Sequence, residues 1–142
     1  ITPEQINYIN AFSNARRMKR DITKLNSPKL GILNPADNTP DSIYGTEGEF
    51  YIGDDNIGVL DYNTPPKTQP GLWCQWVINP ETNEVEWDGG EKFYNYIEWL
   101  NYLIETFFKR WGVILNGVVE WRGEDWDDNG TITVVDNIIT IS

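Results

Sequence analysis

The sequence predicts an α+β domain, because three stretches of the chain carry clear periodic signals. Residues 91–110 repeat apolar side chains at the spacing of an amphipathic helix. Residues 72–87 alternate apolar and polar side chains around a polar turn, which is typical of a β-hairpin. Residues 113–141 hold three short alternating stretches separated by turn-forming residues, which predicts a three-stranded meander. At 142 residues the chain fits one domain with an appended arm.

The first predicted element is a helix over residues 3–25. Thr2 can cap it, Pro3 suits its first position, and Gln5 completes a capping box. The apolar stripe of this helix is thin and its other faces are basic. We therefore divide the chain into a basic helical arm, residues 1–30, and an acidic α+β domain, residues 31–142. The arm either packs on its own acidic body or docks on a neighbouring subunit or another protein. Its candidate docking residues are Arg16, Arg17, Lys19 and Arg20.

Two hairpins are predicted next. Residues 26–42 are rich in Pro, Asn and Ser and read as a linker. Strands at 48–52 and 57–62 around a Gly-Asp-Asp-Asn turn predict the first hairpin. Strands at 72–78 and 84–87 predict the second hairpin, with Glu84 and Glu86 pointing toward solvent. Trp73 and Trp76 fall on opposite faces of this hairpin, so we expect one in the core and the other exposed.

The C-terminal part contains the long helix and the meander. The helix covers residues 91–110, and Gly112 is placed to end it in a left-handed conformation. Its apolar stripe consists of Phe93, Ile97, Leu100, Ile104, Phe107 and Trp111. The strands of the meander are expected at 113–122, 131–135 and 138–141, and the turns at 128–130 and 136–137.

Charge and composition exclude several classes of protein. Residues 1–30 carry six cations against two acids, whereas residues 31–142 carry five cations against twenty acids. The chain has no histidine, so it has neither a histidine-based triad nor a His/Cys zinc site. The single cysteine, Cys74, rules out an intrachain disulfide. An apolar run long enough to span a bilayer is absent from the sequence. The large negative charge opposes direct binding to nucleic acid or to membranes.

A twelve-residue stretch resembles the calcium loop of EF-hand proteins. Asp125, Asp127 and Asn129 occupy its first, third and fifth positions, Gly130 the sixth, and Asp136 the twelfth. The twelfth position is Asp rather than the bidentate Glu, and the flanking residues read as strands. We therefore interpret the stretch as an acidic hairpin tip and keep calcium binding as the minor alternative.

Catalysis is the less favoured interpretation of the acidic residues. Paired carboxylates beside tryptophans are the chemistry of glycosidases, and Glu84, Glu86, Glu120 and Glu124 are the candidates. Acids at alternate positions of a strand ordinarily form a solvent-exposed face. The sequence gives no sign that any of these four acids is buried or paired with another. We therefore expect no enzymatic activity and no cofactor.

The sequence favours a binding protein that presents one anionic face to a cationic site on a protein partner. That site is of the kind that normally holds nucleic acid. The candidate residues are Asp54, Asp55, Glu84, Glu86, Glu120, Glu124, Asp125, Asp127 and Asp128, with Trp126 as the aromatic anchor. One alternative is a structural or virion-type assembly subunit, oligomeric through the arm of residues 1–30. Another is a carbohydrate-binding module with exposed tryptophans.

Residues 71–142, from Gly71-Leu72-Trp73-Cys74-Gln75-Trp76 to the final meander, resemble small acidic proteins of unknown role in bacteria and their phages. This resemblance implies a phage-linked context, such as an inhibitor, and it transfers no functional residue. We expect a location in the cytoplasm of the host cell or in a virion. Export stays an alternative, because the chain starts at Ile1 and a removed upstream segment is compatible with that start.

Overall fold

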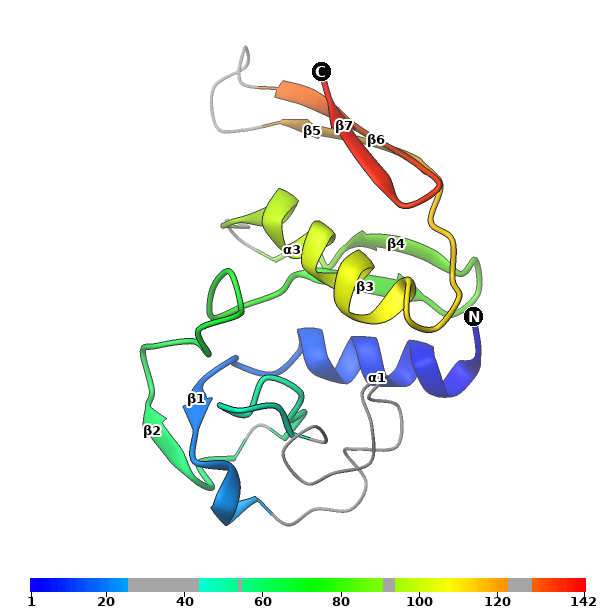
Figure 1. Ribbon diagram of the computed structural model, residues 1–142. Helices are drawn as coiled ribbons and strands as arrows, with labels where there is room; N and C mark the ends of the chain where they lie inside the picture. Colours follow the sequence, from blue (N-terminus) through cyan, green and yellow to red (C-terminus); the bar gives the residue numbers. More distant parts are fainter. Residues whose placement is uncertain (26–43, 54, 91–93, 123–128) are drawn as a thin grey trace. The chain divides into compact units, whose positions relative to one another are not determined.

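The computed structural model describes residues 1–25, 44–53, 55–90, 94–122 and 129–142. Its helices and antiparallel strands confirm the α+β class (Figure 1). The chain forms two compact units, Ile1–Tyr102 and Leu103–Ser142. This division differs from the predicted boundary at residue 30, because residues 1–25 pack into the first unit. Among the described residues, no helix has the length and apolar character needed to cross a membrane.

Helix α1, Pro3–Ser13, begins as the sequence predicts. The Gln5 amide donates to the Thr2 hydroxyl at 3.2 Å, and the Thr2 amide donates to the Gln5 side chain at 3.0 Å. The helix is shorter than the predicted 3–25, because the chain leaves it to bond to a distant segment. The Arg17 amide donates to the Leu72 carbonyl at 2.8 Å, a contact that helical spacing cannot forecast.

The first predicted hairpin does not form. Residues 48–52 are not a strand, and β2, Val59–Asp61, pairs instead with β1, Lys19–Arg20. A 3₁₀ turn, Ile22–Lys24, follows β1. Gly48 has a φ of 82°, and a Cβ at this position would lie 2.9 Å from the Cβ of Arg20. The turn at Gly48 therefore lets the backbone pass close to β1, which a larger residue would prevent.

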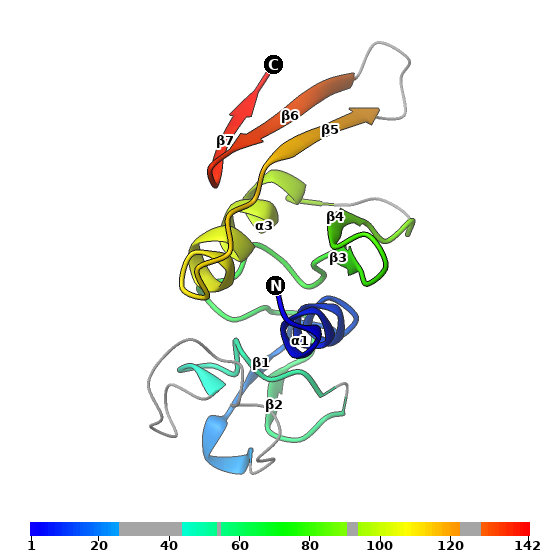
Figure 2. The same ribbon diagram turned by 90° about the vertical axis from the view of Figure 1, so that its right-hand side faces the viewer.

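The second predicted hairpin is confirmed. Strand β3, Trp76–Asn79, pairs antiparallel with β4, Glu84–Trp87. Figures 1 and 2 show β3 between α1 and β4. One side of α1 packs toward α3, Tyr96–Leu103, where the Phe12 ring meets the Trp99 ring edge-on at 6.0 Å. These contacts form the main core of the N-terminal unit.

The long helix continues from α3 into a π-helical segment, Ile104–Phe108. The Lys109 amide donates to the Ile104 carbonyl at 2.9 Å, a spacing of five residues. Trp99, Leu103 and Phe108 are buried in addition to Leu100, Ile104 and Phe107 of the predicted stripe. The predicted start at residues 91–93 lies outside the described residues. Gly112 ends the helical region with a φ of 73°, as predicted.

The C-terminal unit holds the predicted meander of β5, Gly117–Arg122, β6, Asn129–Val135, and β7, Ile138–Ile141. The turn at Asp136-Asn137 is confirmed, with φ values of 50° and 69°. Asn137 also ties this turn to the preceding loop, because the Leu115 amide donates to its side chain at 2.7 Å. The predicted turn at 128–130 is wrong for Asn129 and Gly130, which lie within β6.

Candidate binding surface

The hairpin of β3 and β4 carries a concentrated negative charge, and we call residues 76–88 the acidic hairpin. Its connecting turn is held by hydrogen bonds to Asn79: the Glu81 amide donates to the Asn79 side chain at 2.9 Å, and the Asn83 amide to its carbonyl at 2.8 Å. Asn83 adopts a φ of 60°, which asparagine tolerates better than most residues. The loop is therefore ordered by its own polar side chains.

The two faces of the acidic hairpin differ in chemistry. Trp76 and Ile78 point into the core and are only 3% and 2% exposed. The Trp76 indole also donates to the Tyr96 carbonyl at 2.8 Å, which attaches the hairpin to α3. Glu84 and Glu86 lie on the opposite face and are exposed, as the sequence predicts.

Four carboxylates of the acidic hairpin have no cationic partner among the described residues. Glu81, Glu84, Glu86 and Asp88 are all exposed. The ion pairs within the described part of the chain join Lys19 to Glu47, Arg20 to Asp55 and Lys109 to Glu105, so none involves these four side chains. The sequence between Lys67 and Lys92 contains no cation. These four acids therefore form an uncompensated anionic surface.

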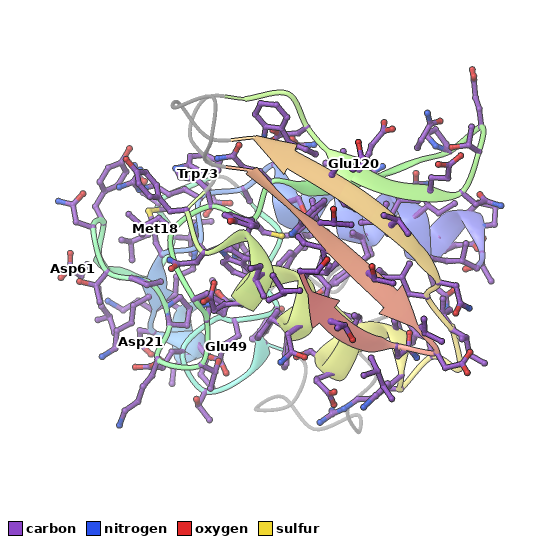
Figure 3. The ribbon with its side chains drawn as sticks, turned by 90° about the horizontal axis from the view of Figure 1, so that it is seen from above. Met18, Asp21, Glu49, Asp61, Trp73 and Glu120 are labelled. Carbon is purple, nitrogen blue, oxygen red and sulfur yellow. The ribbon has the colours of Figure 1, made fainter. Side chains whose placement is uncertain are left out.

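An exposed aromatic ring lies at the end of the same strand, on the face opposite Glu84 and Glu86. Trp87, at the end of β4, is 51% exposed, and its indole donates to the Gln75 side chain at 3.0 Å. Trp73 precedes β3 and is 41% exposed (Figure 3). The exposure of Trp73 beside the buried Trp76 confirms the prediction that the two rings separate. The predicted anchor, Trp126, lies outside the described residues.

A groove lies beside the outer face of the acidic hairpin. It has a volume of about 500 Å³ and runs between α1 and β3. Amides and carboxylates line it, including Asn10, Asn14, Asn79, Glu81 and Glu86. The carboxylates accept hydrogen bonds and carry negative charge, whereas the amides can both donate and accept, so the groove suits a cationic donor such as an ammonium or guanidinium group.

The basic residues predicted to dock on a partner bind their own chain instead. The Arg16 guanidinium stacks on Tyr62 at 4.0 Å and donates to its carbonyl at 2.9 Å. Lys19 pairs with Glu47 at 2.9 Å. Arg17 is buried, with its guanidinium 4.3 Å from the centre of the Phe12 ring, and it donates to the carbonyls of Phe12 and Tyr51.

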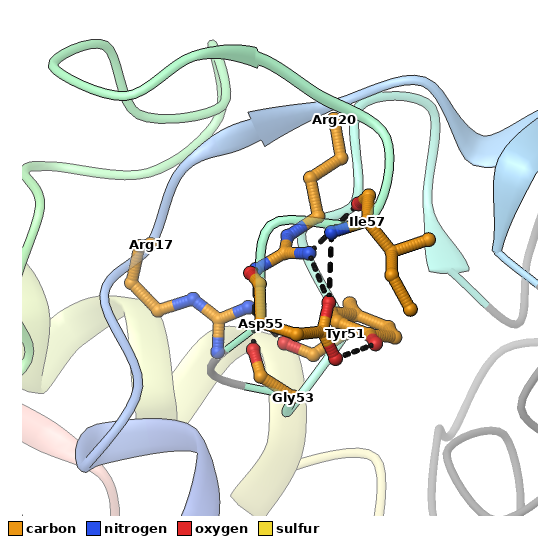
Figure 4. Close-up of polar contacts among 6 residues, drawn as sticks. All are labelled: Arg17, Arg20, Tyr51, Gly53, Asp55 and Ile57. Atoms are coloured by element: carbon orange, nitrogen blue, oxygen red, sulfur yellow. Dashed lines mark hydrogen bonds and ion pairs between the residues drawn. The ribbon is translucent and has the colours of Figure 1, made fainter.

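Arg20 organises the loop that precedes β2 (Figure 4). Its guanidinium donates to the carbonyls of Gly53, Asp55 and Ile57 at 3.2, 2.6 and 2.8 Å, and pairs with the Asp55 carboxylate at 3.0 Å. Arg20 is only 1% exposed, so it cannot contact a second protein. The basic cluster therefore stabilises the fold. Several loop carbonyls converge on one point, and the arginine guanidinium can donate hydrogen bonds to all of them at once.

Asp55 belongs to this structural cluster rather than to a binding face. Partial burial opposes its ionisation, but hydrogen bonds from Tyr51, the Ile57 amide and Arg20 outweigh that effect and lower its pKa. Burial, followed by the hydrogen bond to Asp55, raises the pKa of Tyr51 to about 12. Asp55 is therefore already neutralised by its own chain.

Stability of the N-terminal unit will fall in acid. The pKa values of Asp21, Glu47, Asp55 and Asp61 are all lowered, chiefly by hydrogen bonds, with Asp55 as just described. These carboxylates contribute fully to the free energy of unfolding above their pKa in the unfolded chain, about 4. Their contributions are lost as the pH falls through the lowered pKa values of the folded chain. We expect the stability difference between the wild type and Asp55→Asn to narrow from pH 7 to pH 3. Urea unfolding at both pH values measures it, and a constant difference would contradict the assignment.

The other predicted site residues lie in the C-terminal unit or outside the described residues. Glu120 is exposed on β5, in the C-terminal unit (Figure 3). Asp54, Glu124, Asp125, Asp127 and Asp128 lie outside the described residues. For the calcium alternative, Asn129 and Asp136 are separated by the length of β6, about 20 Å of extended chain. The described residues include no group of three or more acidic or sulfur ligands that could hold a metal.

Cys74 offers no reactive thiolate. It is fully buried, and burial raises its pKa to about 11, so the thiol is neutral near pH 7.

The fold and this surface define a small α+β protein with an anionic, aromatic hairpin. Comparisons with protein-family models, curated proteins and solved structures gave no match.

Sequence reasoning found only part of the acidic hairpin. It placed Glu84 and Glu86 on the solvent face, but it missed Glu81, Asp88 and the exposed ring of Trp87. The signal that could have found them is the run without a cation from residue 68 to residue 91. The acids of this hairpin lie in a segment of the sequence that contains no cation, whereas the net charge of the whole chain does not distinguish them from acids that have cations nearby.

Proposed function

We propose that this chain is a non-enzymatic binding protein whose acidic hairpin occupies a cationic site on a partner protein. The observation that carries the proposal is the set of four exposed carboxylates, which have no cationic partner in the described part of the chain, on the same hairpin as an exposed tryptophan. In line with the resemblance of residues 71–142, the specific form we propose is a phage-linked inhibitor of a site that normally holds nucleic acid.

Electrostatics supports this function in two ways. An uncompensated anionic patch raises the rate of encounter with a cationic surface and disfavours anionic ones. The basic segment of the chain also leaves this patch unopposed, because Arg17 and Arg20 are buried and Lys19 is paired with Glu47. The patch is therefore available to an external cation.

Trp87 supplies the apolar part of the contact. A half-exposed indole can bury a large area with little loss of side-chain freedom, and interface hot spots are enriched in tryptophan. The hydrogen bond to Gln75 fixes the ring before binding, which lowers the entropic cost further.

Neutralising the acidic hairpin will weaken binding to a cationic probe. We expect a Glu81→Gln, Glu84→Gln, Glu86→Gln and Asp88→Asn variant to bind short poly-L-lysine roughly tenfold more weakly at low salt, since each exposed pair contributes a fraction of a kcal/mol. Titration calorimetry and Trp fluorescence at increasing salt measure this. Wild-type affinity should fall steeply as salt rises.

The matched control changes the same number of charges elsewhere. Glu4→Gln, Glu98→Gln, Glu120→Gln and Asp136→Asn alter exposed acids outside the acidic hairpin, so both variants have a net charge of −7 instead of −11. Equal loss of affinity in the two variants would mean that binding depends only on the net charge of the protein, and this would refute a localised site. Absence of binding to the wild type at low salt would refute the function itself.

Carbohydrate binding is the second candidate, because Trp73 and Trp87 are both exposed. Stacking of sugars on these rings predicts quenching of Trp fluorescence by oligosaccharides with little dependence on salt. A Trp87→Ala variant should then lose glycan binding while the four-acid variant retains it.

A further inference from the structure

The outer edge of β3 is closed by side chains of α1. The Asn10 side chain donates to the Ile78 carbonyl at 2.9 Å and accepts from the Ile78 amide at 2.8 Å, as a neighbouring strand would. The Ser13 hydroxyl donates to the Trp76 carbonyl at 2.5 Å. Helix α1 therefore prevents another strand from pairing with this edge.

The outer edge of β4 is paired with no other strand among the described residues of the N-terminal unit. Ile78 lies opposite Val85 and Trp76 opposite Trp87. Since the backbone groups of Ile78 face α1, the alternation of an antiparallel ladder directs those of Val85 and Trp87 away from β3. Within the described residues, the outward amides and carbonyls of Val85 and Trp87 have no hydrogen-bond partner.

We propose that an extended basic segment of a partner protein adds to β4 as a third strand of the acidic hairpin. This inference rests on the proposed function and gives it a mode of binding, which is strand addition to an exposed sheet edge. The backbone groups of Val85 and Trp87 would supply the main-chain hydrogen bonds. The neighbouring side chains would supply the selectivity.

Charge complementarity identifies the occupant. Glu84 and Glu86 lie two residues apart on one face of β4, so a strand added beside them places its alternate residues against two carboxylates. A segment with Lys or Arg at alternate positions fits this face. A second copy of β4, paired antiparallel about Val85, would set Glu84 against Glu86 twice, and such like-charge pairs are destabilising. The occupant is therefore a basic segment of another protein.

The decisive variant is Val85→Pro. Proline removes the outward amide of Val85, and an edge strand tolerates it there because that amide takes no part in the β3–β4 ladder. We expect the affinity for a synthetic peptide that alternates Lys with Thr to fall about tenfold. The proline removes one backbone hydrogen bond to the peptide and also prevents the peptide strand from approaching closely. Titration calorimetry measures the change, and circular dichroism verifies the fold.

Val118→Pro is the matched control. Thr131 exchanges two backbone hydrogen bonds with Ser142, each of 3.0 Å, so the ladder alternation directs Thr133 toward β7. Val118, opposite Thr133, therefore has its amide on the open edge of β5. The same substitution at this second open edge should leave peptide affinity unchanged.

A second measurement is independent of the folding of any variant. The same peptide, N-methylated at the amides that would face β4, keeps its charge but cannot pair as a strand. We expect it to bind at least tenfold more weakly, and we expect the unmethylated peptide to slow hydrogen exchange at the Val85 and Trp87 amides.

The outcomes separate the two proposals. Equal binding of both peptides to the wild type, with affinity lost in the four-acid variant, would overturn strand addition and support the proposed function. Equal loss in Val85→Pro and Val118→Pro would also overturn strand addition. Failure of the wild type to bind either peptide at low salt would overturn both.

Discussion

A Phe12→Ala variant will lose about 3–5 kcal/mol of unfolding free energy, the range for removal of a buried aromatic ring. Phe12 is fully buried and joins α1 to α3 through rings at 6.0 Å from Trp99 and 6.2 Å from Tyr102. Its loss also removes the ring beneath the Arg17 guanidinium. Because small domains are stable by only about 5–15 kcal/mol, this loss removes a large share of the stability of the N-terminal unit.

Urea unfolding monitored by Trp fluorescence measures this loss. The matched control is Tyr94→Ala, which removes an aromatic ring that is 69% exposed and should change stability by no more than about 0.5 kcal/mol. A loss below about 1 kcal/mol for Phe12→Ala would show that α1 does not form the core with α3.

An Arg20→Met variant will be the second most damaging substitution, with a loss of about 3–5 kcal/mol. Methionine fills much of the same space but leaves the carbonyls of Gly53, Asp55 and Ile57 without their donor. These hydrogen bonds are part-buried and come from a charged donor, whose hydrogen bonds contribute about 1.5–3 kcal/mol each, so their loss outweighs any gain from burying an apolar side chain.

Comparison with Asp55→Asn separates the carbonyl contacts from the ion pair. The Asp55 side chain is 42% exposed, so the ion pair is screened and its loss should cost less than the loss of Arg20. The loss of stability in Arg20→Lys should be close to that in Arg20→Met, since an ammonium group lacks the planar, forked donor geometry with which the guanidinium reaches three carbonyls. Thermal unfolding of the three variants gives the order. Equal effects of Asp55→Asn and Arg20→Met would show that the ion pair, not the carbonyl network, holds the loop.

The acidic hairpin was predictable in part because its signal is local. Alternation over residues 72–87 fixes which side chains share a face, and this places Glu84 and Glu86 outside and Trp76 inside. The same alternation cannot show that Asp55 is paired with Arg20 while Glu84 has no partner. Both are acids beside a turn in the sequence, and only long-range contacts distinguish them.

Elements whose signals lie within one helical turn or one hairpin were predictable from the local sequence. These include the capping box at Thr2, the β3–β4 hairpin, the left-handed residue Gly112 and the turn at Asp136-Asn137. Such features depend on backbone preferences and on hydrogen bonds between residues close in the chain.

The end of α1, the strand that pairs with β2 and the pairing of individual charges depend on contacts between residues that are far apart in the chain. Arg17 and Arg20 read as an exposed basic patch, yet they are buried, because carbonyls more than thirty residues away accept their hydrogen bonds. A buried guanidinium is stable only where several acceptors converge on it, and that convergence is a property of the folded chain. The basic segment is therefore engaged within the fold, while the four acids of the acidic hairpin have no cationic partner among the described residues.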